Sequence, residues 1–347
     1  MRVVLTGGGT AGHVTPNIAV IEELKSRGGV EMLYVGSKGG VEKRMIEKIG
    51  IPYEGVHCGK LRRYFSWQNF VDVFKVPLGV WAAAGILRRF KPDVVFSKGG
   101  FVSFPVCVAA WKLGIPVVLH ESDLHLGMAN KWIAGIASTI CVSFEETIES
   151  LPEKLRGKAV YTGTPIRAEI LAGDKEAGLG FCGFNDYKPV VLVMGGSSGA
   201  EQLNILVRAG MDELLKKYQI VHICGRGKLD ISAHSKGYKQ FEYLDEQMKD
   251  IYAASDVAVT RGGANSLFEL AALRKKAVVV PLSMGASRGD QIDNARVFVK
   301  DFGWYMLNGD VGREDFINAV NVAFMQNVGS GKVKNGAKEV VDLLIST

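Results

Sequence analysis

Apolar and polar positions follow two recurring patterns along the chain: short runs rich in Val and Ile, and longer stretches whose apolar residues recur every three or four positions. The first pattern is typical of strands and the second of amphipathic helices, and their alternation predicts βα units around a parallel sheet. Strands that are apolar on both faces indicate a sheet covered on both sides by helices. The predicted strands are Val3–Thr6, Met32–Val35, Asp93–Ser97, Val117–His120, Thr139–Val142, Val190–Met194, Ile220–Cys224, Val257–Thr260 and Ala277–Pro281, and the predicted helices include Asn17–Ser26, Gly40–Ile49, Asp72–Phe90 and Ala264–Leu273.

The two halves of the chain begin alike. The segments VVLTGGGTAGH near the start and VVLVMGGSSGA from Val190 are each an apolar strand, a glycine-rich turn and the beginning of a helix. A length of 347 residues also suits two domains. We therefore predict an α/β fold of two doubly wound domains, residues 1–163 and 164–329, with a C-terminal helix within 330–347 that packs back on the first. Two such sheets facing each other leave a cleft at the carboxyl ends of their strands, where ligands bind.

The composition indicates the cellular compartment more clearly than it indicates the activity. Hydrophobic residues make up 47% and charged residues 22%, which indicates a soluble globular protein. The five cysteines lie far apart, a pattern typical of a reducing compartment rather than of disulfides or zinc sites. A net charge of +6 suits anionic lipid, phosphate-bearing substrates or nucleic acid and does not choose among them. Residues 1–6 form a predicted strand rather than a secretory signal, and glycines interrupt the longest uncharged stretch, so we expect no membrane span.

Two glycine-rich turns indicate that the protein binds phosphate or other anions. The first contains Gly7-x-Gly9-x-x-Gly12, the dinucleotide fingerprint, but the second strand ends in VGSK without a carboxylate for a ribose. This disfavours a nicotinamide or flavin enzyme. The second turn is GGSSG at 195–199. In both turns the glycines let the backbone approach a ligand, and the following helix N-terminus favours anions; a plain strand-to-helix turn is the alternative.

Two later segments carry further polar groups after predicted strands. In RGGANSLFE at 261–269, the backbone N–H groups of residues 263–266 open a helix and can meet a diphosphate. Glu269 lies about one turn into that helix, where its carboxylate can accept hydrogen bonds from two adjacent ribose hydroxyls. The segment SRGDQIDNA at 287–295 concentrates amide and carboxylate groups that suit sugar hydroxyls, unless it is only a solvated helix start.

The order of these motifs is similar to that of a known family. The segments are GGGTAGH at 7–13, KGGFVSFP at 98–105, HESD at 120–123, TGTPIR at 162–167, GGSSGA at 195–200, RGGANSLFE at 261–269 and DQIDNA at 290–295. Together they closely resemble the bacterial peptidoglycan glycosyltransferases that add N-acetylglucosamine (GlcNAc) to lipid I, the undecaprenyldiphospho-muramoylpentapeptide β-N-acetylglucosaminyltransferases. The resemblance extends from residue 1 to at least residue 300. It implies a GT-B fold, two Rossmann-like domains, and inverting transfer of GlcNAc from UDP-GlcNAc to the 4-hydroxyl of the undecaprenyl-linked muramoyl acceptor.

The resemblance also implies which residues bind the substrates. Ser197 matches the serine at the donor phosphates, Leu244 the backbone position that reads uracil, and Glu269 the acid that binds the ribose. Gln291 matches one of two adjacent glutamines that hold the GlcNAc hydroxyls; Asp290 stands in place of the other. The full predicted set is Thr10, Gly12, Asn130, Arg167, Ser197, Leu244, Ala264, Asn265, Glu269, Asp290 and Gln291.

Inverting transfer needs a base for the acceptor hydroxyl and a stabilised leaving group. His13 is the first candidate for the base because an unperturbed imidazole titrates near neutrality; a structural role for His13 is the alternative. Glu121 and Asp123, at the end of a strand in the same half, are further candidates, although Asp123 stands where other family members have asparagine. The sequence contains no Asp-x-Asp, so we expect neither metal nor cofactor, and the leaving diphosphate would be stabilised by Ser197, Arg167 and backbone N–H groups.

The acceptor that the resemblance implies is anchored in a membrane, which makes residues 60–91 relevant. Basic and aromatic side chains are interleaved there, as in interfacial membrane binding, and Trp111 and Trp132 are expected to join them; a role in the core is the alternative. We expect a cytoplasmic protein that is peripheral on the inner face of the cell membrane, with no nucleic acid partner. Competing functions are another GT-B enzyme, such as a diacylglycerol glucosyltransferase or a UDP-GlcNAc 2-epimerase, and a non-catalytic nucleotide-sugar-binding protein.

Overall fold

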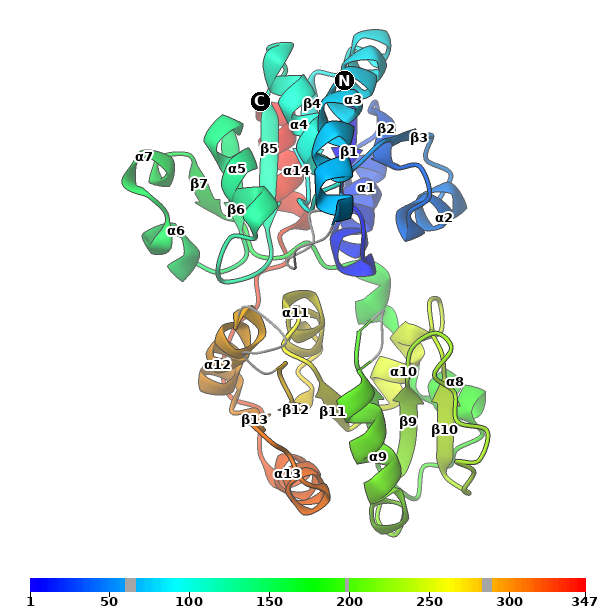
Figure 1. Ribbon diagram of the computed structural model, residues 1–347. Helices are drawn as coiled ribbons and strands as arrows, with labels where there is room; N and C mark the ends of the chain where they lie inside the picture. Colours follow the sequence, from blue (N-terminus) through cyan, green and yellow to red (C-terminus); the bar gives the residue numbers. More distant parts are fainter. Residues whose placement is uncertain (60–66, 197–199, 283–288) are drawn as a thin grey trace. The chain divides into compact units, whose positions relative to one another are not determined.

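The computed structural model describes residues 1–59, 67–196, 200–282 and 289–347 (Figure 1). The chain divides into two compact units, Met1–Arg167 with Lys334–Thr347, and Ala168–Val333. Unit 1 is built on a seven-stranded parallel sheet and unit 2 on a six-stranded parallel sheet. The predicted α/β class is confirmed. The assignment of acceptor and donor binding to the two halves stays a prediction.

The sheet of unit 1 has the strand order β3-β2-β1-β4-β5-β6-β7. Its strands are β1 (Arg2–Thr6), β2 (Glu31–Ser37), β3 (Tyr53–Val56), β4 (Val94–Ser97), β5 (Val117–Glu121), β6 (Thr139–Val142) and β7 (Ala159–Tyr161). Its helices are η1 (Ala11–His13), α1 (Thr15–Arg27), α2 (Val41–Lys48), α3 (Trp67–Phe90), α4 (Ser103–Lys112), α5 (Met128–Ile136), α6 (Glu146–Ser150), α7 (Glu153–Arg156) and α14 (Ala337–Ser346). The direction of winding reverses between β1 and β4, and open α/β sheets bind ligands at such a switch point.

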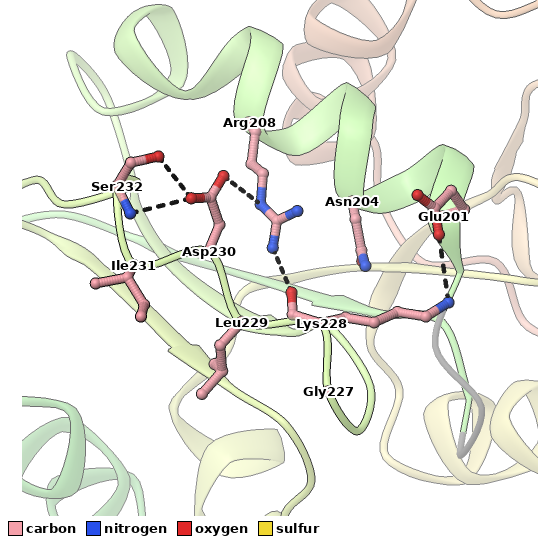
Figure 2. A pocket seen from close by; sticks show the side chains of 9 residues that line it. All are labelled: Glu201, Asn204, Arg208, Gly227, Lys228, Leu229, Asp230, Ile231 and Ser232. Atoms are coloured by element: carbon pink, nitrogen blue, oxygen red, sulfur yellow. Dashed lines mark hydrogen bonds and ion pairs between the residues drawn. The ribbon is translucent and has the colours of Figure 1, made fainter.

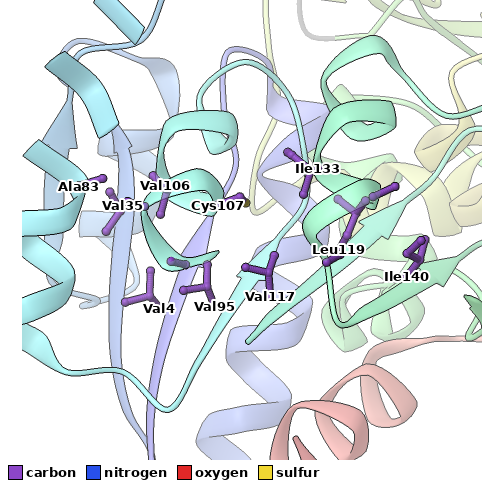
Figure 3. Close-up of a cluster of buried hydrophobic side chains, with 14 of the residues drawn as sticks. Val4, Val35, Ala83, Val95, Val106, Cys107, Val117, Leu119, Ile133 and Ile140 are labelled. Atoms are coloured by element: carbon purple, nitrogen blue, oxygen red, sulfur yellow. The ribbon is translucent and has the colours of Figure 1, made fainter. Parts of the chain in front are cut away.

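Alternate residues of the unit 1 strands supply two separate cores. Figure 3 shows one of them, in which Val4, Val95 and Leu119 contact the apolar sides of α3, α4 and α5. On the opposite face, Val3 and Phe96 belong to a second cluster that includes residues of α1 and α14. The period of two along each strand therefore places helices on both sides of the sheet, as its apolar strands predicted.

The sheet of unit 2 has the strand order β10-β9-β8-β11-β12-β13, with its switch point between β8 and β11. Its strands are β8 (Val190–Met194), β9 (Gln219–Ile223), β10 (Tyr238–Phe241), β11 (Val257–Thr260), β12 (Lys276–Val279) and β13 (Tyr305–Met306). Its helices are η2 (Ala168–Ala172), α8 (Lys175–Cys182), α9 (Glu201–Leu214), α10 (Met248–Ala254), α11 (Ala264–Ala272), α12 (Asp290–Phe302) and α13 (Arg313–Met325). A core cluster beneath α9 and α13 includes Val191, Val259 and Phe316.

The final helix belongs to unit 1 although it follows unit 2 in sequence. Val340, Val341 and Leu344 of α14 are buried in the same cluster as residues of α1. The side chain of Asn335 pairs with the backbone of Ile166 through two hydrogen bonds of 3.1 Å, which fastens this returning segment. Within the described part of the chain, no helix has both the length and the apolar character needed to cross a membrane.

Candidate active site

The turns that follow β1 and β4 meet at the switch point of unit 1. The Lys98 N–H donates to the carbonyl of Thr6 at 2.9 Å, which joins the ends of the two strands. Gly100 has a φ of +82°, and a Cβ there would lie 3.1 Å from the carbonyl oxygen of Gly8. Glycine is therefore required for this close approach, because another residue would be strained as well as crowded. The approach brings the first glycine-rich turn beside the KGGF segment.

His13 ends the short helix η1 within this first turn. Its N–H donates to Thr10 O at 3.1 Å, and its ring Nδ1 lies 3.3 Å from Lys98 O. This geometry assigns the ring proton to Nδ1 and leaves Nε2 as the proton acceptor. Burial lowers the pKa of His13, the Lys98 charge lowers it further, and Asp123 partly opposes them. The imidazole is thus neutral at neutral pH, which is the form that a general base needs.

Glu121 organises the loop after β5. Its buried carboxylate accepts four hydrogen bonds: from the N–H groups of Ser122 and Asp123 at 2.8 and 3.0 Å, from the Gly127 N–H at 2.9 Å, and from Asn130 Nδ2 at 2.8 Å. Both oxygens are therefore engaged by the loop and by the start of α5. This arrangement suits a structural carboxylate better than one that removes a proton from a substrate.

Apart from Arg167, the other predicted residues of unit 1 lie in the turn that contains His13, in the loop that follows Glu121, or in α5. Asp123 is half-buried in the loop after β5 and raises the pKa of both His13 and Lys98 through its charge. Asn130 is buried in α5, and its Oδ1 has no hydrogen-bond partner among the described residues. Thr10 is exposed and Gly12 half-buried in the first turn. The structure thus collects the predicted residues of this half around one switch point.

In unit 2, Glu269 lies on α11 next to β11. Its Oε2 accepts a 3.0 Å hydrogen bond from the hydroxyl of Tyr252, a buried residue of α10, so the carboxylate is held in position. The N-terminus of α11 carries Ala264, which is buried, and Asn265, which is half-buried. The N-cap of this helix is Gly263, which has no side chain of its own to accept from the first N–H groups, and such helix starts are typical diphosphate sites.

The start of α12 lies against the turn that precedes α11. A Cβ on Gly262 would lie 2.1 Å from Gln291 O, and buried Asn294 donates from Nδ2 to Gly262 O at 3.2 Å. Gln291 Oε1 accepts from the Leu282 N–H at 3.0 Å, which orients its amide NH₂ as a donor for a ligand. Asp290, the first residue of α12, is half-buried. The structure thus places Gln291 beside the start of α11.

Three predicted residues remain. Leu244 is half-buried in the turn after β10, next to Tyr243, whose ring lies 5.7 Å from the guanidinium carbon of Arg226. Arg167 is buried at the last position of the first segment of unit 1. Ser197 lies outside the described residues, as do Ser287 and Arg288 of the polar segment. In the described ranges, no group of three or more His, Cys, Asp or Glu side chains is placed to hold a metal ion.

Comparison with known proteins decides the family. The sequence matches the N-terminal domain of glycosyltransferase family 28 over residues 3–142 and its C-terminal domain over residues 190–328. It is 51% identical over 322 residues to the UDP-N-acetylglucosamine–N-acetylmuramyl-(pentapeptide) pyrophosphoryl-undecaprenol N-acetylglucosamine transferase of Lachnospira eligens, covering 92% of this chain and 90% of that protein. The Clostridium tetani protein of the same name is 45% identical over 351 residues, covering 99% of this chain and 97% of that one. The chain belongs to this transferase family.

Solved structures agree on the fold. Acinetobacter baumannii MurG superimposes with a TM-score of 0.68 at 22% identity, covering 100% of this chain and 99% of that one. The UDP-GlcNAc 2-epimerase of Neisseria meningitidis, solved with UDP-GlcNAc bound, gives a TM-score of 0.66 at 16% identity, with coverage of 100% and 99%. Identities this low show the fold alone. Together with the matched family domains, they confirm the predicted GT-B class for this member of the transferase family.

Four residues near these sites had no role assigned from the sequence. Lys98 and Glu42 are buried at the first glycine-rich turn, and Glu42 accepts hydrogen bonds from Ser37 N at 2.9 Å and Gly9 N at 3.3 Å. Tyr252 orients Glu269. Arg261 begins the RGGANSLFE segment, and its buried Nε has no hydrogen-bond partner within the described ranges. Lys98, Glu42 and Arg261 each lie within two residues of a Gly-Gly pair, which was the only available signal and points to no contact by itself, and the position of Tyr252 carried no signal.

A surface hollow of about 570 Å³ in unit 2 contains none of the predicted residues (Figure 2). It lies between α9 and the loop after β9. Its charges pair with one another: Arg208 Nε lies 3.7 Å from Asp230 Oδ2, and Lys228 Nζ lies 3.5 Å from Glu201 Oε2. Because each cation faces an acid, the hollow favours no ligand of one charge, and we assign it none.

Proposed function

We propose that this protein transfers GlcNAc from UDP-GlcNAc to the 4-hydroxyl of undecaprenyl-diphospho-N-acetylmuramoyl-pentapeptide, the step from lipid I to lipid II, with inversion at the anomeric carbon. One structural observation carries the chemistry: His13 lies at the switch point of unit 1 with its Nδ1 beside Lys98 O and a lowered pKa. The names of the full-length relatives favour this acceptor over those of the other GT-B enzymes considered above.

In the proposed reaction, unit 1 binds the acceptor and unit 2 the donor. His13 Nε2 accepts the proton of the 4-hydroxyl while that oxygen attacks the anomeric carbon of GlcNAc. The bond from this carbon to the β-phosphate oxygen of UDP breaks, and its electron pair passes to the diphosphate. The N–H groups at the start of α11 stabilise the charge that develops there. Glu269 accepts hydrogen bonds from the ribose, and Gln291 donates to a sugar hydroxyl.

The remaining predicted residues complete the proposed sites. Leu244 reads the uracil through its backbone, and Ala264, Asn265, Ser197 and Arg167 lie at the diphosphate. Asp290 shares the GlcNAc hydroxyls with Gln291. On the acceptor side, Thr10, Gly12, Asp123 and Asn130 contact the muramoyl part. The orphan Oδ1 of Asn130 supports this role, because a buried acceptor without a partner gains a hydrogen bond when a donor arrives.

The proposed function is tested by incubating the full chain with labelled UDP-GlcNAc and a lipid I analogue, in the presence of EDTA. We expect label in the lipid product and undiminished turnover with EDTA, because the proposed stabilisation of the diphosphate uses N–H groups of the protein. If the protein binds UDP but labels no lipid, the proposed acceptor is wrong. Conversion of UDP-GlcNAc to its 2-epimer without acceptor would favour the epimerase alternative.

We also propose that α3, α4 and α5 contact the membrane. These helices cover one face of the sheet of unit 1, and their outer surfaces carry large apolar side chains with a high exposed fraction: Leu78 60%, Trp81 78%, Trp111 55% and Trp132 49%. Exposed Lys112 and Lys131 lie next in sequence to two of the tryptophans. Tryptophan bordered by lysine is typical of helices that bind an anionic membrane surface. Of the predicted segment 60–91, residues 60–66 lie outside the described residues.

Trp81→Ala tests this surface. We expect the variant to bind vesicles of phosphatidylglycerol and phosphatidylcholine about tenfold more weakly. A tryptophan that becomes buried in the membrane interface contributes at least ~1.4 kcal/mol to binding through its apolar area. Co-sedimentation with the vesicles measures the change. Tyr187→Ala is the matched control because it removes an exposed aromatic side chain from unit 2. Equal binding by Trp81→Ala and wild type would remove α3 from the proposed contact.

A further inference from the structure

Lys98 is a buried lysine at the switch point of unit 1. It directly follows β4, and only 2% of its surface is exposed. Its N–H donates to Thr6 O, the last residue of β1, so its backbone is fixed where the two central strands end. Gly7 makes room for it, because a Cβ on Gly7 would lie 3.1 Å from Lys98 Cβ. The side chain therefore starts beneath the glycine-rich turn that carries His13.

Lys98 contacts both turns that carry the candidate catalytic groups. Its carbonyl oxygen lies 3.3 Å from His13 Nδ1, in the turn after β1. Its ammonium Nζ donates to Ser122 Oγ at 2.6 Å, in the loop after β5. Ser122 is the residue between Glu121 and Asp123. Lys98 thus connects the base candidate on one turn, through its backbone carbonyl, with the acidic loop on the other, through its side chain.

The fold alone gives no reason for a charge at this position. An ammonium group taken out of water costs free energy, and one hydrogen bond donated to a serine hydroxyl compensates for only part of it. Burial is accordingly the main cause that lowers the pKa of Lys98 to about 8, against the opposing charges of Glu121 and Asp123. An unbranched apolar side chain such as methionine would fill the same volume without this cost. Buried charges with such perturbed titration are concentrated at functional sites.

We propose that Lys98 is a positioning residue for the transfer, which joins the turn that carries His13 to the loop that carries Asp123 and keeps His13 in its proton-accepting form. This inference rests on the proposed function, in which His13 is the base. Lys98 itself touches no reacting atom in this scheme. It acts through the hydrogen bond between its carbonyl and His13 Nδ1, which orients the ring, and through its positive charge, which disfavours the imidazolium.

The sign of the charge effect depends on every charged group that faces His13. Lys98, at the end of β4, lowers the pKa of His13, whereas Asp123 after β5 and Glu42 of α2 raise it. Lys98 is in turn faced by Glu121 and Asp123. Lys98→Met removes the only cation among these groups. Burial still lowers the pKa of His13 and the two acids still raise it, so without the lysine charge this pKa is higher than in wild type. A smaller fraction of His13 is then neutral below neutral pH.

The test compares wild type, Lys98→Met and Lys98→Arg as full chains. Imidazole-¹⁵N-labelled histidine reports the titration of each ring by NMR, and the His13→Gln variant assigns the His13 signal. We expect His13 to titrate at higher pH in Lys98→Met than in wild type, and near the wild-type pH in Lys98→Arg, which keeps the charge. Lys154→Met makes the same chemical change at an exposed lysine on α7 and should move nothing.

The same variants are compared in the transfer assay across pH. We expect the acidic limb of kcat/KM to move to higher pH in Lys98→Met, with kcat/KM at pH 6 about two- to fourfold below wild type and the KM for UDP-GlcNAc unchanged. Equal His13 titration in wild type and Lys98→Met would overturn the inference even if transfer is observed. If the titration moves as expected but wild type transfers no GlcNAc to lipid I, the proposed function fails and the charge coupling between Lys98 and His13 stands.

Discussion

His13→Ala will lower kcat for GlcNAc transfer by a factor of about 10²–10⁴, the usual contribution of a positioned general base. Its affinity for UDP should equal that of wild type, because Leu244 and Glu269, which are proposed to bind the uracil and the ribose, belong to unit 2 and His13 to unit 1. Single-turnover transfer and calorimetric titration with UDP measure the two quantities. A variant that keeps more than a tenth of wild-type kcat would show that His13 only orients the acceptor.

Glu121→Ala tests Glu121 against His13 as the base. Its carboxylate accepts four hydrogen bonds from the loop and α5, so its removal leaves buried donors without a partner. We expect a loss of about 2–4 kcal/mol in the free energy of unfolding and a lower Tm, together with loss of activity. His13→Ala should leave the Tm nearly unchanged. The exposed Glu145→Ala serves as the control. An inactive Glu121→Ala with the Tm of wild type would instead favour Glu121 as the base.

Glu269→Ala will weaken UDP binding by about 100-fold or more, because hydrogen bonds between a carboxylate and two ribose hydroxyls contribute about 1.5–3 kcal/mol each. The KM for UDP-GlcNAc should rise in proportion, with a small change in kcat, since these bonds are equal in the ground and transition states. Isothermal titration with UDP and steady-state kinetics give both values. A drop in kcat with unchanged UDP affinity would contradict the assignment of Glu269 to the ribose.

Two variants control this measurement. Tyr252→Phe removes the hydroxyl that donates to Glu269 Oε2 at 3.0 Å but keeps the carboxylate, so it should weaken UDP binding by a smaller factor than Glu269→Ala. Glu314→Ala removes an exposed glutamate from the first turn of α13 and should bind UDP as wild type does. Equal weakening by Glu314→Ala would indicate a general effect of net charge.

The sequence predicted the interior of both sheets and none of their edges. All nine predicted strands are present, and the four that were missed are β3, β7, β10 and β13, the outermost strand at each edge. An inner strand is covered on both faces and reads as an apolar run such as VVLVM of β8, in which every residue is buried. An edge strand such as YKQF of β10 pairs on one side only and is partly exposed. Its polar residues interrupt the apolar pattern from which a strand is predicted.

The candidate sites show a similar contrast. Their glycine-rich turns could be predicted from the sequence, whereas the contacts between distant residues could not. The glycine-rich turns after strands could be recognised in the sequence, because the positive φ of Gly100 and the crowding at Gly262 require glycine there. The hydrogen bond between Lys98 and Ser122 could not be predicted, since the two residues lie 24 positions apart and meet only once β4 and β5 are side by side. The four donors to Glu121 likewise belong to a loop conformation that no spacing rule encodes.

The return of the chain to unit 1 has a consequence for biosynthesis. Unit 2 is one continuous segment and can complete its core as soon as Val333 has left the ribosome. Unit 1 cannot, because Val340, Val341 and Leu344 of α14 close the cluster that contains β1 and α1. At ordinary elongation rates, about 10–40 s separate the emergence of Arg167 from that of α14. During this interval the nascent N-terminal segment presents an uncovered apolar face, which makes it the part of the chain that a ribosome-associated chaperone would bind.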